Sequence, residues 1–244
     1  MQKKYSGFLF LLFFFFIPFL VFGQENPSNF VNFLGLFKLG GIFMYPLLLF
    51  SILTLGVILE KLFVFFKSGF FLPPKNFYYQ IITFIKKQEI QKALDFCDKS
   101  KKSIENKILK HSLLSLKIGL KEFEKQLEAT TYFYLHFLEK RLHILSILGN
   151  LAPLTGFLGT VSGMIAAFKK IALANQISVQ LVASGIYEAL ITTAAGLIIA
   201  LFALGFYNFF VYKIDKFLKN LEGVSYQITQ IYSKENENKV DQKS

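Results

Sequence analysis

The chain has 244 residues, of which 53% are hydrophobic, and its formal net charge is +11. This apolar share exceeds that of ordinary soluble domains and predicts a protein that spans a membrane. The charge does not indicate nucleic-acid binding, because the lysines flank and separate apolar runs, as in the positive-inside loops of membrane proteins. The single cysteine, Cys97, excludes an internal disulfide. No spacing of Cys and His residues predicts a metal site, and we expect no cofactor.

The first 23 residues have the pattern of an export signal. Lys3 and Lys4 form a basic N-terminal region, and residues 8–22 form the apolar region. This stretch ends in small or compact residues of the kind that a signal peptidase recognises. The alternative is an uncleaved anchor helix, against which Pro18 and the short length argue. Both interpretations place residues 24–39 outside the cytoplasm, so the topology that follows does not depend on the choice.

Residues 40–66 are predicted to form the first membrane-spanning helix. The run from Leu39 to Leu59 is uncharged over 21 residues. At about 1.5 Å per residue, a helix of this length matches the thickness of the hydrocarbon layer. Pro46 lies near the outer end, where a missing N–H costs a helix least.

Residues 67–141 form the one sizeable polar region. Fifteen Lys or Arg residues stand there against eight acids, and this excess predicts a cytoplasmic location. Apolar residues recur at helical spacing, and their charged neighbours are expected to form solvated faces. No proline lies between Ile104 and Arg141, so one long helix through Arg141 into the second span is allowed. The apolar positions are Phe77, Ile81 and Ile85, then Ile90, Ala93, Leu94 and Cys97, then Ile104, Ile108, Leu109, Leu113, Leu116, Leu120, Phe123 and Leu127.

Residues 142–168 are predicted as the second span, followed by a short outer loop at residues 169–178. Small residues share one face of this span, and such faces let membrane helices approach closely. We favour packing over a direct role for the glycines. The hydroxyl of Thr160 suits a polar lumen, although a bond back to its own helix is an equal alternative. The face holds Gly156, Gly159, Thr160, Gly163 and Ala167.

Residues 179–212 are predicted as a third span that is longer than the bilayer is thick, so its inner end should extend into the cytoplasm. Between Lys170 and Lys213 the only charged residue is Glu188. A carboxylate at the centre of a membrane helix costs about 3 kcal/mol, so it is expected to face protein or water. Glu188 therefore indicates an intramembrane proton or ion path, with a buried structural role as the alternative.

The third span has two neighbouring faces of small and polar residues. Two such faces imply neighbours on two sides, which favours a ring or bundle over a lone monomer. Thr160 and Glu188 lie at similar depth and Thr193 lies deeper, so a polar ladder is expected to run among them. The first face holds Ser184, Glu188, Thr192 and Ala195, and the second holds Ala189, Thr193, Gly196, Ala200 and Ala203. Residues 213–244 form a mixed-charge cytoplasmic tail, predicted to be disordered from Ser233.

Three segments together carry a specific resemblance. The stretches Asn150–Pro153, Gly156–Met164 and Val182–Leu197, followed by Tyr207-Asn208, resemble the MotA/TolQ/ExbB proton channel family. The three-span layout with a large first cytoplasmic loop is similar to ExbB and TolQ, and it lacks the four spans of MotA. The resemblance implies an all-α integral protein of the bacterial inner membrane, with a periplasmic mature N-terminus and a cytoplasmic C-terminus. Its long second and third membrane helices are expected to extend into a cytoplasmic helical bundle.

The resemblance also implies an assembly. Subunits form a pentameric ring around the single-span helices of a partner, ExbD or TolR, whose membrane aspartate carries the proton. Proton flow then drives work on TonB or TolA, most readily TonB-dependent import, with a TolQ-type role in envelope integrity as the alternative. A non-conducting scaffold is a further alternative. An intramembrane protease is disfavoured, because apart from Glu60 at the inner end of the first span, the spans hold only Glu188 and His143 as carboxylate or imidazole groups.

The resemblance assigns roles to named residues. The pore threonines of the family match Thr160 and Thr193, and its intramembrane glutamate matches Glu188. Thr192 is added as a pore candidate without a family role. Many members have proline where Ser184 and Phe202 stand here, which bears on the bends of the third span. The residues expected to serve helix packing are Gly156, Gly159, Gly163, Gly185 and Gly196.

Overall fold

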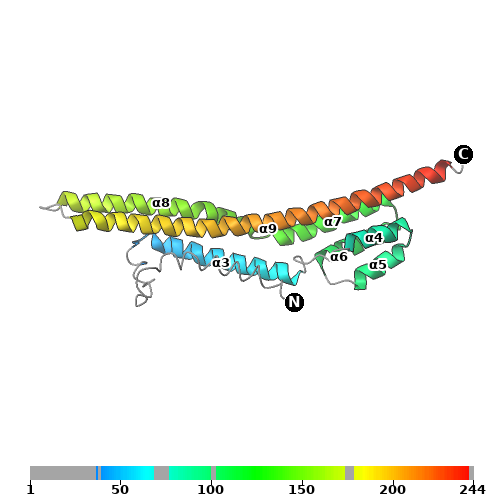
Figure 1. The fold of residues 1–244 in the computed structure, drawn as a ribbon, viewed down its shortest axis with the longest axis horizontal. Coiled ribbons are helices and arrows are strands. Elements are labelled where there is room, and N and C mark those ends of the chain that lie inside the picture. Colours follow the sequence, from blue (N-terminus) through cyan, green and yellow to red (C-terminus); the bar gives the residue numbers. More distant parts are fainter. Residues whose placement is uncertain (1–36, 38–39, 69–76, 100–102, 174–178, 242–244) are drawn as a thin grey trace. The chain divides into compact units, whose positions relative to one another are not determined.

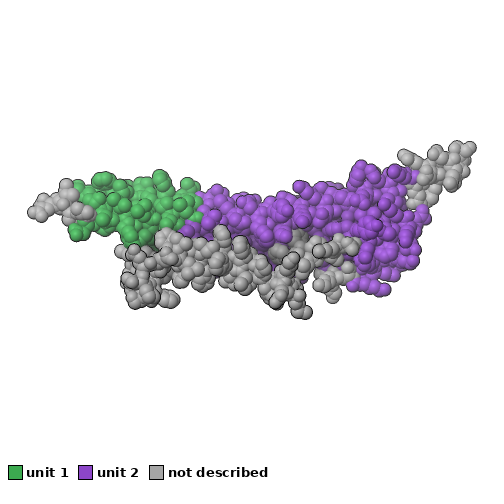
Figure 2. All heavy atoms as spheres, viewed as in Figure 1, with its two compact units in different colours: residues 1–48, 153–197 green, residues 49–152, 198–244 purple. Residues whose placement is uncertain are grey.

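The computed structural model describes residues 37, 40–68, 77–99, 103–173 and 179–241. The predicted signal at residues 1–23 and nearly all of the outer segment at residues 24–39 lie outside these ranges. Across the described ranges, all regular structure is helical. The chain divides into two compact units (Figure 2), one of residues 1–48 with 153–197 and one of residues 49–152 with 198–244.

Three long apolar helices dominate the described chain. They are α3 (Met44–Lys67), α8 (Leu142–Leu173) and α9 (Val179–Asp241), as Figure 1 shows. By length and composition, three ranges suffice to cross a membrane: Met44–Lys67, Leu120–Leu173 and Val182–Lys234. Large apolar side chains on all three helices are exposed, as expected of surfaces that meet lipid. The prediction of an all-α chain with three membrane-length helices is confirmed for the described residues.

The unit of residues 49–152 and 198–244 holds the polar region's helices. These are α4 (Phe77–Lys86), α5 (Ile90–Lys99), α6 (Ile104–Ser115) and α7 (Leu120–Glu139). Their inward faces are the apolar positions expected from helical spacing, including Ile81, Ile108 and Phe123, which are fully buried. Ser103 caps α6 by accepting a hydrogen bond from the Asn106 N–H at 3.2 Å.

The single helix that the sequence allows from Ile104 into the second span does not form, because the structure breaks it twice. The first break separates α6 from α7 and ends at Gly119, a residue type with low helix propensity. The second lies at Lys140 and Arg141, and Arg141 has a φ of 67°, in the left-handed region that interrupts a right-handed helix. The absence of proline alone therefore does not predict helix continuity.

Side chains from α3 fasten the break between α7 and α8. Lys61 is 2% exposed, and its Nζ donates a hydrogen bond to the Leu138 carbonyl at 2.8 Å, one of the free carbonyls at the end of α7. Arg141 Nη1 donates to Glu60 Oε2 at 2.5 Å. Glu60 and Lys61 of α3 therefore hold the turn that leads into α8.

The second half of α9 packs through an apolar seam that the description of residues 213–244 as a mixed-charge tail missed. Its buried residues recur at spacings of three and four, which places them on one helical stripe. The seam begins at Phe210, whose ring lies 5.0 Å from that of Phe65. The helix is described as far as Asp241, so the disorder predicted from Ser233 is not seen in the described part of that segment. Gly and Pro, the residues least suited to a helix, are absent after Gly223. The seam residues are Phe210, Ile214, Phe217, Leu221, Val224 and Ile228.

Candidate functional site

Helices α8 and α9 pack closely through glycines in the unit of residues 1–48 and 153–197. A Cβ added to Gly156 would lie 2.8 Å from the Thr192 carbonyl oxygen. One added to Gly163 would lie 3.0 Å from the Gly185 carbonyl oxygen, and one added to Gly185 would lie 2.5 Å from the Ala167 Cβ. These distances are shorter than ordinary contacts, so the two backbones approach as closely as side-chain-free residues allow. Gly196, the fifth glycine expected to serve packing, is also buried.

Thr192 lies inside this contact. Its side chain is fully buried, and a Cβ on Gly159 would collide with it. The hydroxyl donates to the Ala189 carbonyl at 2.9 Å and lies 3.4 Å from the Gly156 carbonyl of the facing helix. This geometry satisfies the hydroxyl between the two helices, as burial requires. In one copy of the chain, Thr192 therefore contributes to packing and polar cross-linking of the α8–α9 pair.

Thr193 of α9 lies beside the stretch of α8 that contains Thr160. Both are half-buried. Thr193 Oγ1 lies 3.4 Å from the Gly156 carbonyl oxygen, and in an α-helix that carbonyl also receives the N–H of residue 160. Thr160 Oγ1 donates back to the Phe157 carbonyl at 2.7 Å, which is the local bond that its sequence context allowed. The roles of both threonines in a pore remain proposals.

Glu188 lies elsewhere on α9. Its carboxylate lies against Gly41, just before α3 begins, and the side chain is half-buried. Five residues separate Glu188 from Thr193, which turns them about 140° apart around the helix. Among the described residues, no hydrogen bond joins the Glu188 carboxylate to Thr160 or Thr193. The structure thus places Thr193 against Gly156, one helical turn of α8 from Thr160, and Glu188 on another flank of α9.

The two positions where the family often has proline do not interrupt α9. The helix is continuous from Val179 to Asp241, through Ser184 and Phe202. Proline inside a helix removes one backbone hydrogen bond and bends the axis. The ordinary residues at these positions are therefore compatible with an unbroken third helix.

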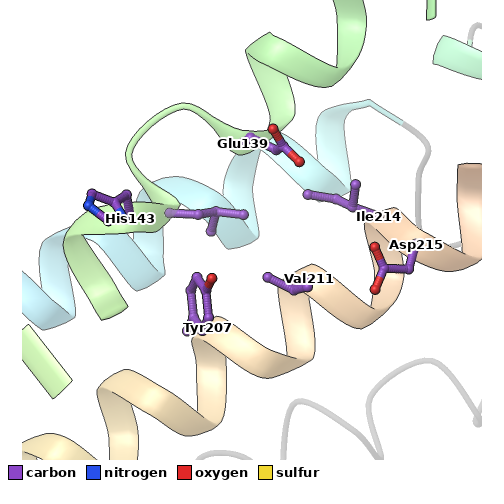
Figure 3. A pocket seen from close by; sticks show the side chains of 7 residues that line it. Glu139, His143, Tyr207, Val211, Ile214 and Asp215 are labelled. Atoms are coloured by element: carbon purple, nitrogen blue, oxygen red, sulfur yellow. The ribbon is translucent and has the colours of Figure 1, made fainter. Parts of the chain in front are cut away.

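A cavity of about 250 Å³ lies in the unit of residues 49–152 and 198–244 (Figure 3). Its polar lining comes from Glu139 and His143 beside the α7–α8 break, and from Tyr207 and Asp215 on α9. Sequence reasoning missed it, because these residues are far apart in the chain. In the part of the chain that the structure describes, no three His, Cys, Asp or Glu residues are grouped as metal ligands. The cavity therefore has acidic character without a built metal site.

A buried carboxyl group lies among the helices of the polar region. Glu105 of α6 is 4% exposed and faces Tyr78 of α4. Burial raises the pKa of Glu105 above its usual range, and the neighbouring Tyr78 hydroxyl partly offsets this rise. Burial also raises the pKa of Tyr78, and the neighbouring Glu105 charge adds to it. Both groups therefore favour their neutral forms in the folded protein.

Comparisons with known proteins agree on one family. The sequence profile of the MotA/TolQ/ExbB proton channel family matches residues 100–223, which include Thr160, Glu188 and Thr193. The biopolymer transport protein ExbB-like 1 of Synechocystis sp. is 31% identical over 171 residues, 69% of this chain and 66% of that protein. ExbB of Salmonella typhimurium is 35% identical over 91 residues, 37% of each chain. The Tol-Pal system protein TolQ of Haemophilus influenzae is 44% identical over 71 residues, 29% of this chain and 31% of that protein. The match spans 66% or less of the length of each of these three relatives.

Proposed function

Because the chain belongs to the MotA/TolQ/ExbB proton channel family, we propose that it is a proton-channel subunit of an energy-transducing motor in the bacterial inner membrane. The observation that carries the proposal is the α8–α9 pair. Thr193 of α9 approaches the Gly156 carbonyl of α8, one helical turn from Thr160, and Glu188 is the one charged residue between Lys170 and Lys213. Relatives named ExbB and TolQ support the motor role.

The proposed assembly is a homopentameric ring in the lipid bilayer. In a single copy, Leu190 and Leu197 of α9 and Phe157 of α8 are exposed, which leaves apolar surface for lipid or for further copies. We propose that the ring surrounds a single-span ExbD- or TolR-like partner, whose membrane aspartate carries the proton. The ring would form the stationary wall of the channel. Each chain would act as a channel subunit and not as an enzyme.

The proposed pathway uses Thr160 and Thr193 as hydroxyl groups that line the lumen. A hydroxyl can both accept and donate a hydrogen bond, so it can bind a water molecule that carries a proton next to the partner's aspartate. Thr192 is proposed as a supporting residue, since its hydroxyl is already used between the helices. Glu188 supplies the carboxylate of the third span.

The proposed work is TonB-dependent import across the outer membrane, because two relatives described above are named biopolymer transport proteins. The TolQ relative supports a second candidate, a motor that maintains envelope integrity. Deleting the gene separates them: loss of energised nutrient uptake supports the first, and sensitivity to detergents with normal uptake supports the second. The proposed topology places the N-terminus in the periplasm and the C-terminus in the cytoplasm.

The direct test is proton flux into liposomes that contain the chain with and without its single-span partner. We expect flux only with the partner, and its loss in Glu188→Ala and in Thr160→Val with assembly retained. Thr54→Val is the matched control, because it removes a buried hydroxyl from α3 and leaves every residue of the α8–α9 contact unchanged. Normal flux in both test variants would overturn the site, and assembly without flux in the wild type would support a scaffold.

A further inference from the structure

A tight turn at Gly40 and Gly41 leads into α3. Gly41 has a φ of 67°, in the left-handed region that glycine adopts without the steric penalty of a Cβ. The Met44 N–H donates to the Gly41 carbonyl at 3.3 Å, so the turn joins directly to the first turn of the helix. The backbone at Gly41 is therefore set by the start of the first span.

This turn lies against α9 at Glu188. A Cβ on Gly41 would collide with Oε1 of Glu188 and would lie 2.8 Å from its Cδ and 3.5 Å from its Cγ. A Cβ on Gly40 would lie 3.3 Å from Cγ2 of Ile191, which is three residues further along the same face of α9. The carboxylate thus occupies the space that the missing side chain of Gly41 leaves open.

The start of α3 is also a favourable electrostatic neighbour for an anion. The aligned peptide dipoles of α3 give this end a partial positive charge. Its first N–H groups are already used within the turn, since those of Met44, Tyr45 and Leu47 donate to the carbonyls three or four residues before them. The Glu188 carboxylate lies beside the residue that leads into that first turn. In a membrane-spanning segment, few other groups can offset the cost of a carboxylate.

We propose that Gly41 is a positioning residue for Glu188, so that the first span sets the place of the third span's carboxylate. This inference rests on the proposed function for its effect on proton flux. Glu188 then acts from the α3 side of α9, while Thr193 acts from a flank about 140° away around the same helix. A displaced carboxylate changes flux even when the ring and the threonines are intact.

The test begins with Gly41→Ala in the full chain assembled with its single-span partner. The added methyl group displaces the carboxylate, and we expect a several-fold lower proton flux and a lower Tm. Gly56→Ala is the matched control, because it lies on α3 with no other atom within 4 Å of the added Cβ. We expect Gly56→Ala to retain wild-type flux.

Rescue separates positioning from a general structural defect. Glu188→Asp shortens the side chain by one methylene group and withdraws the carboxylate from the new methyl. We expect Gly41→Ala with Glu188→Asp to exceed Gly41→Ala alone in both flux and Tm, although Glu188→Asp alone lowers flux. No rise in Tm on adding Glu188→Asp would overturn the contact, and equal flux in Gly41→Ala and Gly56→Ala would overturn the positioning role. If the wild type passes no protons, the proposed function fails, while the four Tm values still test the contact.

Discussion

The close approach of α8 and α9 gives a quantitative prediction at Gly185. In Gly185→Ala, the new Cβ would lie 2.5 Å from the Ala167 Cβ and 2.9 Å from the Gly163 carbonyl oxygen. Carbon atoms prefer about 3.5–4.0 Å, so the pair falls short by about 1 Å or more. Neither neighbour can rotate away, because one is an alanine methyl and the other is backbone. The helices must therefore separate.

The magnitude follows from two opposing terms. Overpacking of this kind costs about 1–3 kcal/mol, while replacing glycine by alanine inside a helix contributes about 0.8–1.0 kcal/mol of stability. Gly205→Ala on α9 gains the second term without the first, because nothing lies within 4 Å of its Cβ. The difference between the two variants isolates the packing cost at about 2 kcal/mol, or about 4–8 °C in Tm for a chain of this size.

The assay is thermal unfolding of both variants in the same detergent, followed by circular dichroism. We expect Gly205→Ala at or above the wild-type Tm and Gly185→Ala below it. Equal Tm values for the two variants would refute the inference that these helices are in backbone contact.

Three further predictions concern the polar region and its junction with α8. The unfolding free energy of Glu105→Gln should increase relative to that of the wild type as pH rises. The folded state raises the pKa of Glu105 above 4.5, so the stability that protonated Glu105 contributes is complete below that pH and is lost as pH increases. A constant Tm difference from pH 4 to 8 would contradict this. Arg141→Gly should exceed Arg141→Ala by about 1 kcal/mol in unfolding free energy, because only alanine is strained at a φ of 67°; both lose the Glu60 ion pair. Burial raises the pKa of the Cys97 thiol to about 12, so iodoacetamide at pH 8 should label it only after unfolding; rapid labelling of the folded protein would exclude this environment.

The membrane-spanning helices were predictable because their signal is local. The uncharged run before Glu60 and the single carboxylate between Lys170 and Lys213 can be read directly from the sequence. Helical spacing also identified residues such as Ile81 and Ile108 that the fold buries. Each of these signals comes from residues that are close together in the sequence, so it does not depend on which helices pack together.

The helix breaks were less predictable. Proline is the usual sequence signal of a helix break, and none lies at this one. The left-handed conformation of Arg141 is instead held by groups far away in the sequence: Glu60 binds its guanidinium, and Lys61 binds the carbonyl of Leu138 shortly before it. Sequence spacing along a single helix contains no information about these partners. The burial of Lys61, a residue type that usually meets water at an interface, has the same origin.

The sequence by itself determined that Glu188 is the lone charge between Lys170 and Lys213, and that small residues line the membrane-spanning helices around it. Only the tertiary structure decided that Thr192 is buried between α8 and α9, and that the Glu188 carboxylate lies against Gly41. The physical reason is that periodicity defines the faces of one helix, whereas the partner of each face depends on how closely another backbone approaches. Glycines with no side chain set that approach, and their partners lie up to about 150 residues away in the chain.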